Sequence, residues 1–279
     1  MFLSGEQVPT IIRLRQSQEQ QIFDCLCANK EINLFLMGFL AEHPVDHAWW
    51  YGVLHEGTVT GVIMVLPTRL AVPWIPEPND AVLLGRMLHT QHRPCLMVGP
   101  RETCDILWRV WAGDTQWDRY YEQRLYVASD ALVGVGIPGF RRAHLEEWRT
   151  VAKNAGLMEE EDLGINPHKE NPLLHEKAVR ERIKVGRTFV ISLQSEIVFQ
   201  INVGTVTPWG CQIGGTYVPP KWRGQKVATH GMAELNRHLL QSHSLVTLHV
   251  NEANTPAVRL YERTGFVRST PMRLITLTT

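Results

Sequence analysis

Residues 217–229, YVPPKWRGQKVAT, constrain the fold most strongly, because they predict a strand, a tight turn and a helix start in immediate succession. Pro219 and Pro220 exclude a helix at the turn, since proline lacks the N–H that a helix interior needs. After Arg223 and Gly224, apolar or small residues recur at every fourth position, which keeps them on one helix face. These residues are Val227, Gly231, Leu235 and Leu239. The helix is therefore predicted to begin just after Gly224.

The predicted helix start is suited to binding an anion. The first N–H groups of a helix have no partner within it, and the helix macrodipole places partial positive charge there. An anionic ligand at this point is stabilised without any special side chain. Residues 217–229 therefore predict a phosphate site, and a pyrophosphate fits the pattern.

A second informative segment follows along the chain. Residues 246–250 alternate apolar and polar side chains as a strand does, and residues 251–254 predict a turn into a short helix. Thr255 suits the N-cap of that helix, and Gly265 suits the left-handed position after its end. The residues between them form about two helical turns, which carry Tyr261.

Together the two segments resemble the motifs that identify the GNAT superfamily of acyl-CoA-dependent N-acetyltransferases. Residues 217–228 resemble motif A, in which Arg/Gln-x-x-Gly-x-Gly/Ala follows a strand that ends in valine. Residues 254–266 resemble motif B, to which Asn254 and Tyr261 belong. One residue departs from the pattern, because Lys226 stands where motif A usually has its middle glycine.

The resemblance implies the chemistry of acetyl transfer. A primary amine of a small molecule or peptide would attack the thioester of acetyl-CoA, or of another short acyl-CoA, in a ternary complex, with no metal and no covalent enzyme intermediate. Tyr261 would protonate the departing thiolate. The residues that the resemblance assigns to acyl-CoA binding are Tyr217, Val218, Arg223, Gly224, Gln225, Lys226, Val227, Ala228, Thr229 and Asn254.

The motifs specify the proton acceptor less closely. We take Glu252 as the candidate catalytic base, and His249, Glu176 or a chain of water molecules remain open alternatives. The resemblance also places a backbone N–H of the strand over residues 214–218 against the thioester oxygen. The first two residues of this strand are glycines, which permit a bulge that separates it from the strand over residues 246–250.

The first half of the chain repeats the order of strands and helices of the second half. We therefore predict an α/β (α+β) fold of two tandem GNAT-like domains, each with a mixed, mostly antiparallel sheet flanked by helices. This arrangement is similar to bacterial proteins in which a degenerate N-terminal copy precedes an intact one. Residues 1–130 would form the degenerate domain and residues 131–279 the acyl-CoA-binding domain. Where the first domain should carry a phosphate loop, residues 73–79 lack Arg-Gly, and Glu77 and Asp80 would repel phosphate.

Residues 134–139, GVGIPG, fit the glycine pattern of dinucleotide-binding folds. That fold requires the next helix to lead into a parallel strand. The helix predicted over residues 143–155 leads instead into an acidic loop, residues 159–172. We therefore interpret residues 134–139 as the interdomain linker rather than part of an oxidoreductase. The acidic loop and the first domain are expected to line the acceptor.

Charge and composition limit the remaining function classes. The chain has 28 basic and 28 acidic residues, so no net field attracts nucleic acid or an anionic membrane. Its apolar runs are too short to span a bilayer, and its N-terminus lacks a signal-peptide pattern, which predicts a cytoplasmic protein. We expect it to be a monomer or a homodimer. Five cysteines without repeated spacing predict reduced thiols. The alternative to an enzyme is a non-catalytic acyl-CoA-binding regulatory or scaffold protein.

Overall fold

The computed structural model of the protein describes residues 9–91, 94–113, 117–130 and 137–276. Its contacts divide the chain into two compact units. The first unit comprises Met1–Leu125, His249–Asn254 and Ser269–Thr279, and the second comprises Tyr126–Leu248 and Thr255–Arg268. Residues 131–136 lie outside the described residues. The domain boundary predicted after residue 130 adjoins this gap, and the first three residues of the glycine segment 134–139 fall within it.

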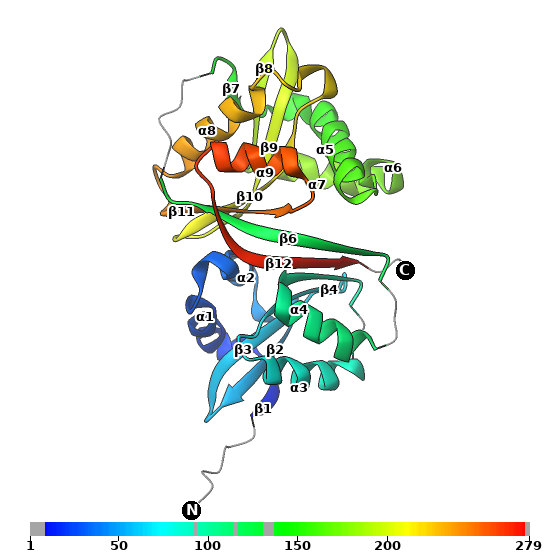
Figure 1. The fold of residues 1–279 in the computed structure, drawn as a ribbon, viewed down its shortest axis with the longest axis vertical. Coiled ribbons are helices and arrows are strands. Elements are labelled where there is room, and N and C mark those ends of the chain that lie inside the picture. Colours follow the sequence, from blue (N-terminus) through cyan, green and yellow to red (C-terminus); the bar gives the residue numbers. More distant parts are fainter. Residues whose placement is uncertain (1–8, 92–93, 114–116, 131–136, 277–279) are drawn as a thin grey trace, which may run out of the picture. The chain divides into compact units, whose positions relative to one another are not determined.

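The first unit contains a mixed sheet flanked by helices (Figure 1). Its strands follow the order β1-β2-β3-β4-β5-β12-β6. The pairing of β4 with β5 is parallel, whereas β1-β2, β2-β3, β3-β4 and β5-β12 are antiparallel. The elements are β1 (Thr10–Leu14), α1 (Glu19–Cys27), α2 (Lys30–Glu42), β2 (Trp49–His55), β3 (Thr58–Val65), β4 (Leu70–Trp74), α3 (Pro78–His89), β5 (Leu96–Pro100), α4 (Arg101–Leu107), a π-helical turn (Trp108–Ala112), β6 (Arg119–Ala128) and β12 (Val267–Thr276).

The second unit contains another mixed sheet, in the order β11-β10-β9-β8-β7. The pairing of β10 with β11 is parallel, and the other pairs are antiparallel. Its elements are β7 (Phe140–Arg142), α5 (Trp148–Leu163), α6 (Pro167–Glu170), α7 (Pro172–Lys184), β8 (Thr188–Leu193), β9 (Glu196–Val206), β10 (Gly210–Tyr217), α8 (Val227–Leu239), β11 (Leu245–Asn251) and α9 (Thr255–Arg263). The predicted fold class, a mostly antiparallel sheet flanked by helices, is confirmed.

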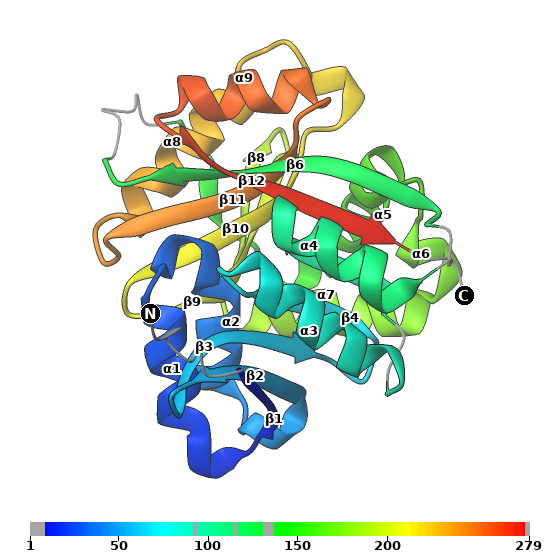
Figure 2. The ribbon, with the colours of Figure 1, turned by 60° about the horizontal axis from the view of Figure 1, so that its bottom comes forward.

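Helices cover both faces of the second sheet (Figure 2). Successive side chains of a strand point to opposite faces. On β9, Phe199 packs so closely on Gly231 of α8 that a Cβ there would lie 2.6 Å from the ring. The next residue, Gln200, donates to the backbone oxygen of Val151 on α5, at 3.3 Å. Helix α8 therefore covers one face, and α5 covers the other together with α7, which packs against it.

One arrangement occurs in both units. In the first, the parallel neighbours β4 and β5 are joined through α3, and in the second, the parallel neighbours β10 and β11 are joined through α8. This is the repetition that the order of elements predicted. It makes the starts of α3 and α8 comparable positions in the two units.

The structure corrects the predicted helix over residues 143–155 and the acidic loop after it. Helix α5 runs from Trp148 to Leu163, so the four acidic residues 159–162 lie on a helix. Glutamate is a good helix former, and the helix ends only at Gly164, whose φ of 66° is left-handed. The short edge strand β7 was also not predicted, since its three residues are too few to show periodicity.

Candidate functional site

Strand β10 leaves its parallel neighbour partway along its length. The ladder pairs Gly210–Gln212 of β10 with residues 245–247 of β11. Against β9, the register shifts between Gly214 and Tyr217, and Gly215 has a φ of 68°. A Cβ on Gly215 would lie 2.7 Å from Asn202 Nδ2, so glycine is required by both backbone angle and space. The bulge expected at these glycines is present, and it lies beyond the end of the parallel ladder.

A tight turn connects the end of β10 to α8. Trp222 N–H donates to Pro219 O at 2.9 Å, and the chain then passes Gly224 in the left-handed region, at a φ of 75°. The first α-helical hydrogen bond at the start of α8 is donated by His230 N–H to Lys226 O, at 3.0 Å. The N–H groups of residues 227–229 precede that bond and have no acceptor within the helix.

Space is open in front of this helix start. A Cβ placed on Gly224 would have no heavy atom within 4 Å. An anion can therefore approach the turn closely enough to accept hydrogen bonds from backbone N–H groups. The phosphate site predicted from residues 217–229 stays a prediction, to which this open helix start corresponds.

Lys226, which departs from motif A, keeps the backbone conformation of a glycine. Its φ of 60° and ψ of 10° are left-handed, a region that costs an ordinary residue roughly 1–2 kcal/mol. Its side chain is exposed, so it adds a positive charge beside the turn without filling it. The substitution therefore preserves the path of the turn at the cost of backbone strain.

Arg223 is paired in this structure. Its Nη2 donates to both carboxylate oxygens of Glu161, at 2.9 and 2.8 Å, and its Nε donates to Val218 O at 2.9 Å. The two side chains are 47% and 48% exposed, so the pair is worth about 0–1 kcal/mol. Glu161 belongs to α5, and its carboxylate occupies the Nη2 group of Arg223. Sequence reasoning missed this contact because it placed residues 159–162 in a loop.

Other predicted binding residues line the turn in different ways. Tyr217 is buried beneath the Arg223 guanidinium, 5.8 Å from its ring centroid, and burial raises the pKa of the phenol. Gln225 Nε2 closes the turn by donating to Lys221 O at 3.0 Å. Val227 is buried in the core of the second unit, whereas Ala228 and Thr229 are half-buried in the first turn of α8.

Tyr261 lies on α9 and points to the bulged part of β10. Its hydroxyl is 3.3 Å from Thr216 Oγ1, and the residue is 7% exposed. Burial raises the pKa of Tyr261, with a smaller opposing effect of the Thr216 hydrogen bond, so the phenol is neutral at physiological pH. A neutral hydroxyl beside the part of β10 that lies beyond its parallel ladder with β11 is able to donate a proton. Thr216 is a residue that the motifs did not indicate.

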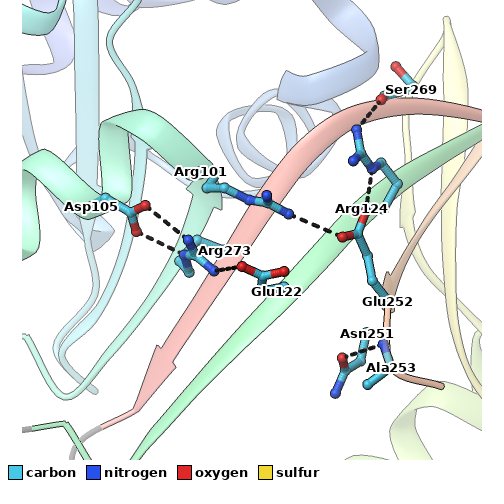
Figure 3. Close-up of polar contacts among 9 residues, drawn as sticks. All are labelled: Arg101, Asp105, Glu122, Arg124, Asn251, Glu252, Ala253, Ser269 and Arg273. Carbon is cyan, nitrogen blue, oxygen red and sulfur yellow. Dashed lines mark hydrogen bonds and ion pairs between the residues drawn. The ribbon is translucent and has the colours of Figure 1, made fainter.

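Glu252 and Asn254 belong to the turn between β11 and α9. Asn254 N–H donates to Asn251 O at 2.9 Å, and Ala253 N–H donates to Asn251 Oδ1 at 3.0 Å. Figure 3 shows the Glu252 carboxylate between two arginines, with Arg124 Nε at 2.7 Å from one oxygen and Arg101 Nη2 at 3.3 Å from the other. Contacts assign this turn to the first unit, so its part in acetyl transfer stays a prediction.

The two alternative bases differ in their surroundings. Glu176 lies on α7 with an oxygen 3.9 Å from Arg180 Nη2. His249 lies on β11, and its Nε2 is buried with no hydrogen-bond partner among the described residues. Burial lowers the pKa of His249 to about 4. The imidazole is therefore neutral at pH 7 but a much weaker base than an ordinary histidine.

Burial of His249 predicts acid sensitivity. Its folded-state pKa of about 4 lies below the ordinary 6.5, so the unfolded chain binds the proton more tightly. The free energy of unfolding should fall as pH drops from about 6.5 to 4, by roughly 3 kcal/mol from this group. Urea titrations across that range measure the slope. His249→Leu should flatten it, and an unchanged slope in that variant would contradict the assignment.

In the first unit, the start of α3 corresponds to the start of α8, and it carries the acidic side chain of Asp80. Asp80 lies in the first turn of α3, is 3% exposed, and has Oδ2 2.8 Å from Nε2 of His55 on β2. Asp80 and Ala81 N–H groups both donate to Glu77 O, at 3.1 and 3.2 Å. A carboxylate already complements the helix dipole there, so a phosphate would be repelled.

Among the residues that the structure describes, no group of three or more His, Cys, Asp or Glu side chains is placed to hold a metal ion. None of their helices is long and apolar enough to cross a membrane.

Known proteins resemble this chain in sequence over part of its length and in fold over nearly all of it. Residues 155–266 match the acetyltransferase (GNAT) family. A GNAT-family acetyltransferase from Colwellia psychrerythraea aligns at a TM-score of 0.61 and 10% identity, covering 96% of this chain and 100% of that one. A GCN5-related N-acetyltransferase from Sphaerobacter thermophilus aligns at 0.64 and 14%, covering 98% and 96%.

A third solved structure has two such domains. It is a tandem GNAT protein from the clavulanic acid biosynthesis pathway, which aligns at a TM-score of 0.57 and 13% identity, covering 98% of this chain and 99% of that one. At these identities the similarity concerns the fold. No curated protein sequence matches the chain. The resemblance drawn from the two motifs is confirmed for the C-terminal part.

Proposed function

We propose that this protein transfers an acetyl group from acetyl-CoA to a primary amine, since residues 155–266 match the acetyltransferase (GNAT) family. The observation that carries the proposal is the start of α8, where free N–H groups follow a left-handed turn and face open space at Gly224. Acetyl-CoA is the proposed co-substrate, and no metal takes part in the proposed reaction.

We propose that acetyl-CoA binds along the second unit, from the turn before α8 to the bulge in β10. The N–H groups at the start of α8 donate hydrogen bonds to the pyrophosphate oxygens, and Arg223 exchanges Glu161 for a phosphate oxygen. The part of β10 beyond Gln212, outside the parallel ladder, holds the pantetheine arm and offers an N–H to the thioester oxygen. Asn254 contributes to binding through the turn before α9.

Tyr261 is the proposed proton donor. The amine nitrogen forms a bond to the thioester carbon, the C–S bond breaks, and the Tyr261 hydroxyl gives its proton to the thiolate sulfur. Glu252 is the proposed acceptor of the proton that the amine loses. No covalent bond to the protein forms, and holding both substrates together supplies much of the rate.

Residues 1–130 are proposed to be a degenerate GNAT-like domain that shapes the acceptor site, and residues 131–279 to be the acyl-CoA-binding domain. The closed start of α3 supports this division of roles. We propose a bacterial cytoplasmic protein, monomeric or a homodimer, with an amine-bearing acceptor as partner rather than nucleic acid or membrane.

Thiol release from acetyl-CoA in the presence of a panel of primary amines tests the proposal. We expect at least one amine to accelerate release, with one acetylated amine detected by mass spectrometry for each thiol formed. Calorimetry on the same preparation should give one acetyl-CoA site per chain. Tight binding without amine-dependent release would favour the regulatory or scaffold alternative, and no binding would reject both.

A further inference from the structure

The turn that joins β11 to α9 is fixed by charged residues far from it in sequence. Arg124 on β6 is 15% exposed and Arg101 at the start of α4 is 28% exposed, and they bind the two oxygens of Glu252. Arg124 Nη1 also donates to Ser269 O, at 3.1 Å. Figure 3 shows these residues reaching the turn from separate elements.

The backbone of the turn is held as well. Glu252 N–H donates to Glu122 O on β6, at 2.8 Å. With the hydrogen bonds inside residues 251–254, both the side chain and the main chain of Glu252 are therefore fixed. A half-buried carboxylate held by two guanidinium groups forms charge-assisted hydrogen bonds, which are stronger and more directional than an exposed pair.

A neighbouring group of charges fixes α4 itself. Arg273 on β12 donates to both oxygens of Asp105, at 2.8 and 2.9 Å, and its guanidinium stacks on the Tyr120 ring at 3.9 Å. Asp105 lies one turn after Arg101 on α4. Because Arg273 is 5% exposed, this contact holds α4 firmly and so sets the position from which Arg101 reaches Glu252.

We infer that Arg124, assisted by Arg101, is a positioning residue for acetyl transfer, acting through Glu252. The next residue after the turn is Thr255, the first of α9, and α9 carries Tyr261. Glu252 is the proposed proton acceptor, and the two arginines set where its carboxylate lies. Arg101 and Arg124 lie outside residues 155–266, the part of the chain that matches the acetyltransferase (GNAT) family.

The inference rests on the proposed function, and Arg124→Met tests it. The expected result is a 10- to 100-fold lower kcat, about the effect of a small misplacement of reacting groups, with acetyl-CoA affinity within threefold of wild type. Arg124→Lys keeps a cation that reaches one oxygen and should recover part of the loss. Arg119→Met, on the same strand β6 but bonded to the Tyr121 hydroxyl, is the matched control and should leave kcat unchanged.

A double variant separates positioning from fold stability. Arg124→Met combined with Glu252→Gln should be no slower than Glu252→Gln alone, because Arg124 acts through the Glu252 carboxylate, which that variant already lacks. Additive losses, or a lower melting temperature with unchanged kcat, would overturn the inference. Hydrogen exchange at the Ala253 and Asn254 amides should accelerate in Arg124→Met even if no amine is acetylated. This measurement therefore tests the positioning of the turn separately from the proposed acetyl transfer.

Discussion

Gly224→Asp is expected to weaken acetyl-CoA binding about 100-fold, the largest effect on affinity of any single change at the turn. Open space where a Cβ would lie leaves room for the new side chain, and the φ of 75° strains any residue other than glycine, a cost that a control substitution at this position shares. The loss comes from the ligand, because a carboxylate would stand beside the pyrophosphate and repel it. Calorimetry with acetyl-CoA measures the change.

Gly224→Asn is the matched control, since asparagine has the shape of aspartate without its charge and tolerates the left-handed region. It should bind acetyl-CoA within about tenfold of wild type. Arg223→Ala should cost at most about fivefold, because Arg223 is half exposed and already satisfied by Glu161. Equal affinities for wild type and the Asp variant would remove the start of α8 as the binding site.

Tyr261→Phe should lower the transfer rate by roughly 10²- to 10⁴-fold, the usual value of a positioned proton donor. The thiolate charge on which the hydroxyl would act develops only in the transition state, so kcat and kcat/KM should fall together. Acetyl-CoA affinity should stay nearly constant. Steady-state kinetics and calorimetry on the same variant separate the two effects.

Stability distinguishes this role from simple packing. The phenyl ring of the variant keeps the contact with Phe266, whose ring centroid is 5.8 Å away, and only the 3.3 Å hydrogen bond to Thr216 is lost. Thr216→Val removes the same hydrogen bond while leaving the Tyr261 hydroxyl, and should retain most of the activity. If Tyr261→Phe instead melts at a lower temperature and keeps its rate, Tyr261 is a core tyrosine.

The sequence predicted those parts of the fold that depend on local signals. Pro219, Pro220 and Gly224 fix a turn through their backbone preferences, and the four-residue spacing of apolar side chains fixes the face of α8. The bulge at Gly215 was predictable for the same reason, because glycine pairs in a strand mark an irregular backbone. These preferences act within a few residues and need no tertiary contact.

Features that depend on distant contacts were missed. The pairing of Arg223 with Glu161 joins residues far apart in the sequence, and so does that of Glu252 with Arg124. No periodicity relates such residues, and every exposed charge has several possible partners. The length of α5 was missed for a different reason: a run of acidic residues was interpreted as a loop, although glutamate favours a helix.

The resting pair of Arg223 with Glu161 bears on which anions the turn selects. An anion that reaches only Arg223 replaces one carboxylate by another negative group and gains almost nothing. A ligand that also accepts hydrogen bonds from the N–H groups at the start of α8 gains contacts that Glu161 does not provide. A single inorganic phosphate has fewer oxygens to share between Arg223 and these N–H groups than a pyrophosphate ester has. We therefore expect Glu161 to compete with inorganic phosphate for Arg223 more effectively than with acetyl-CoA.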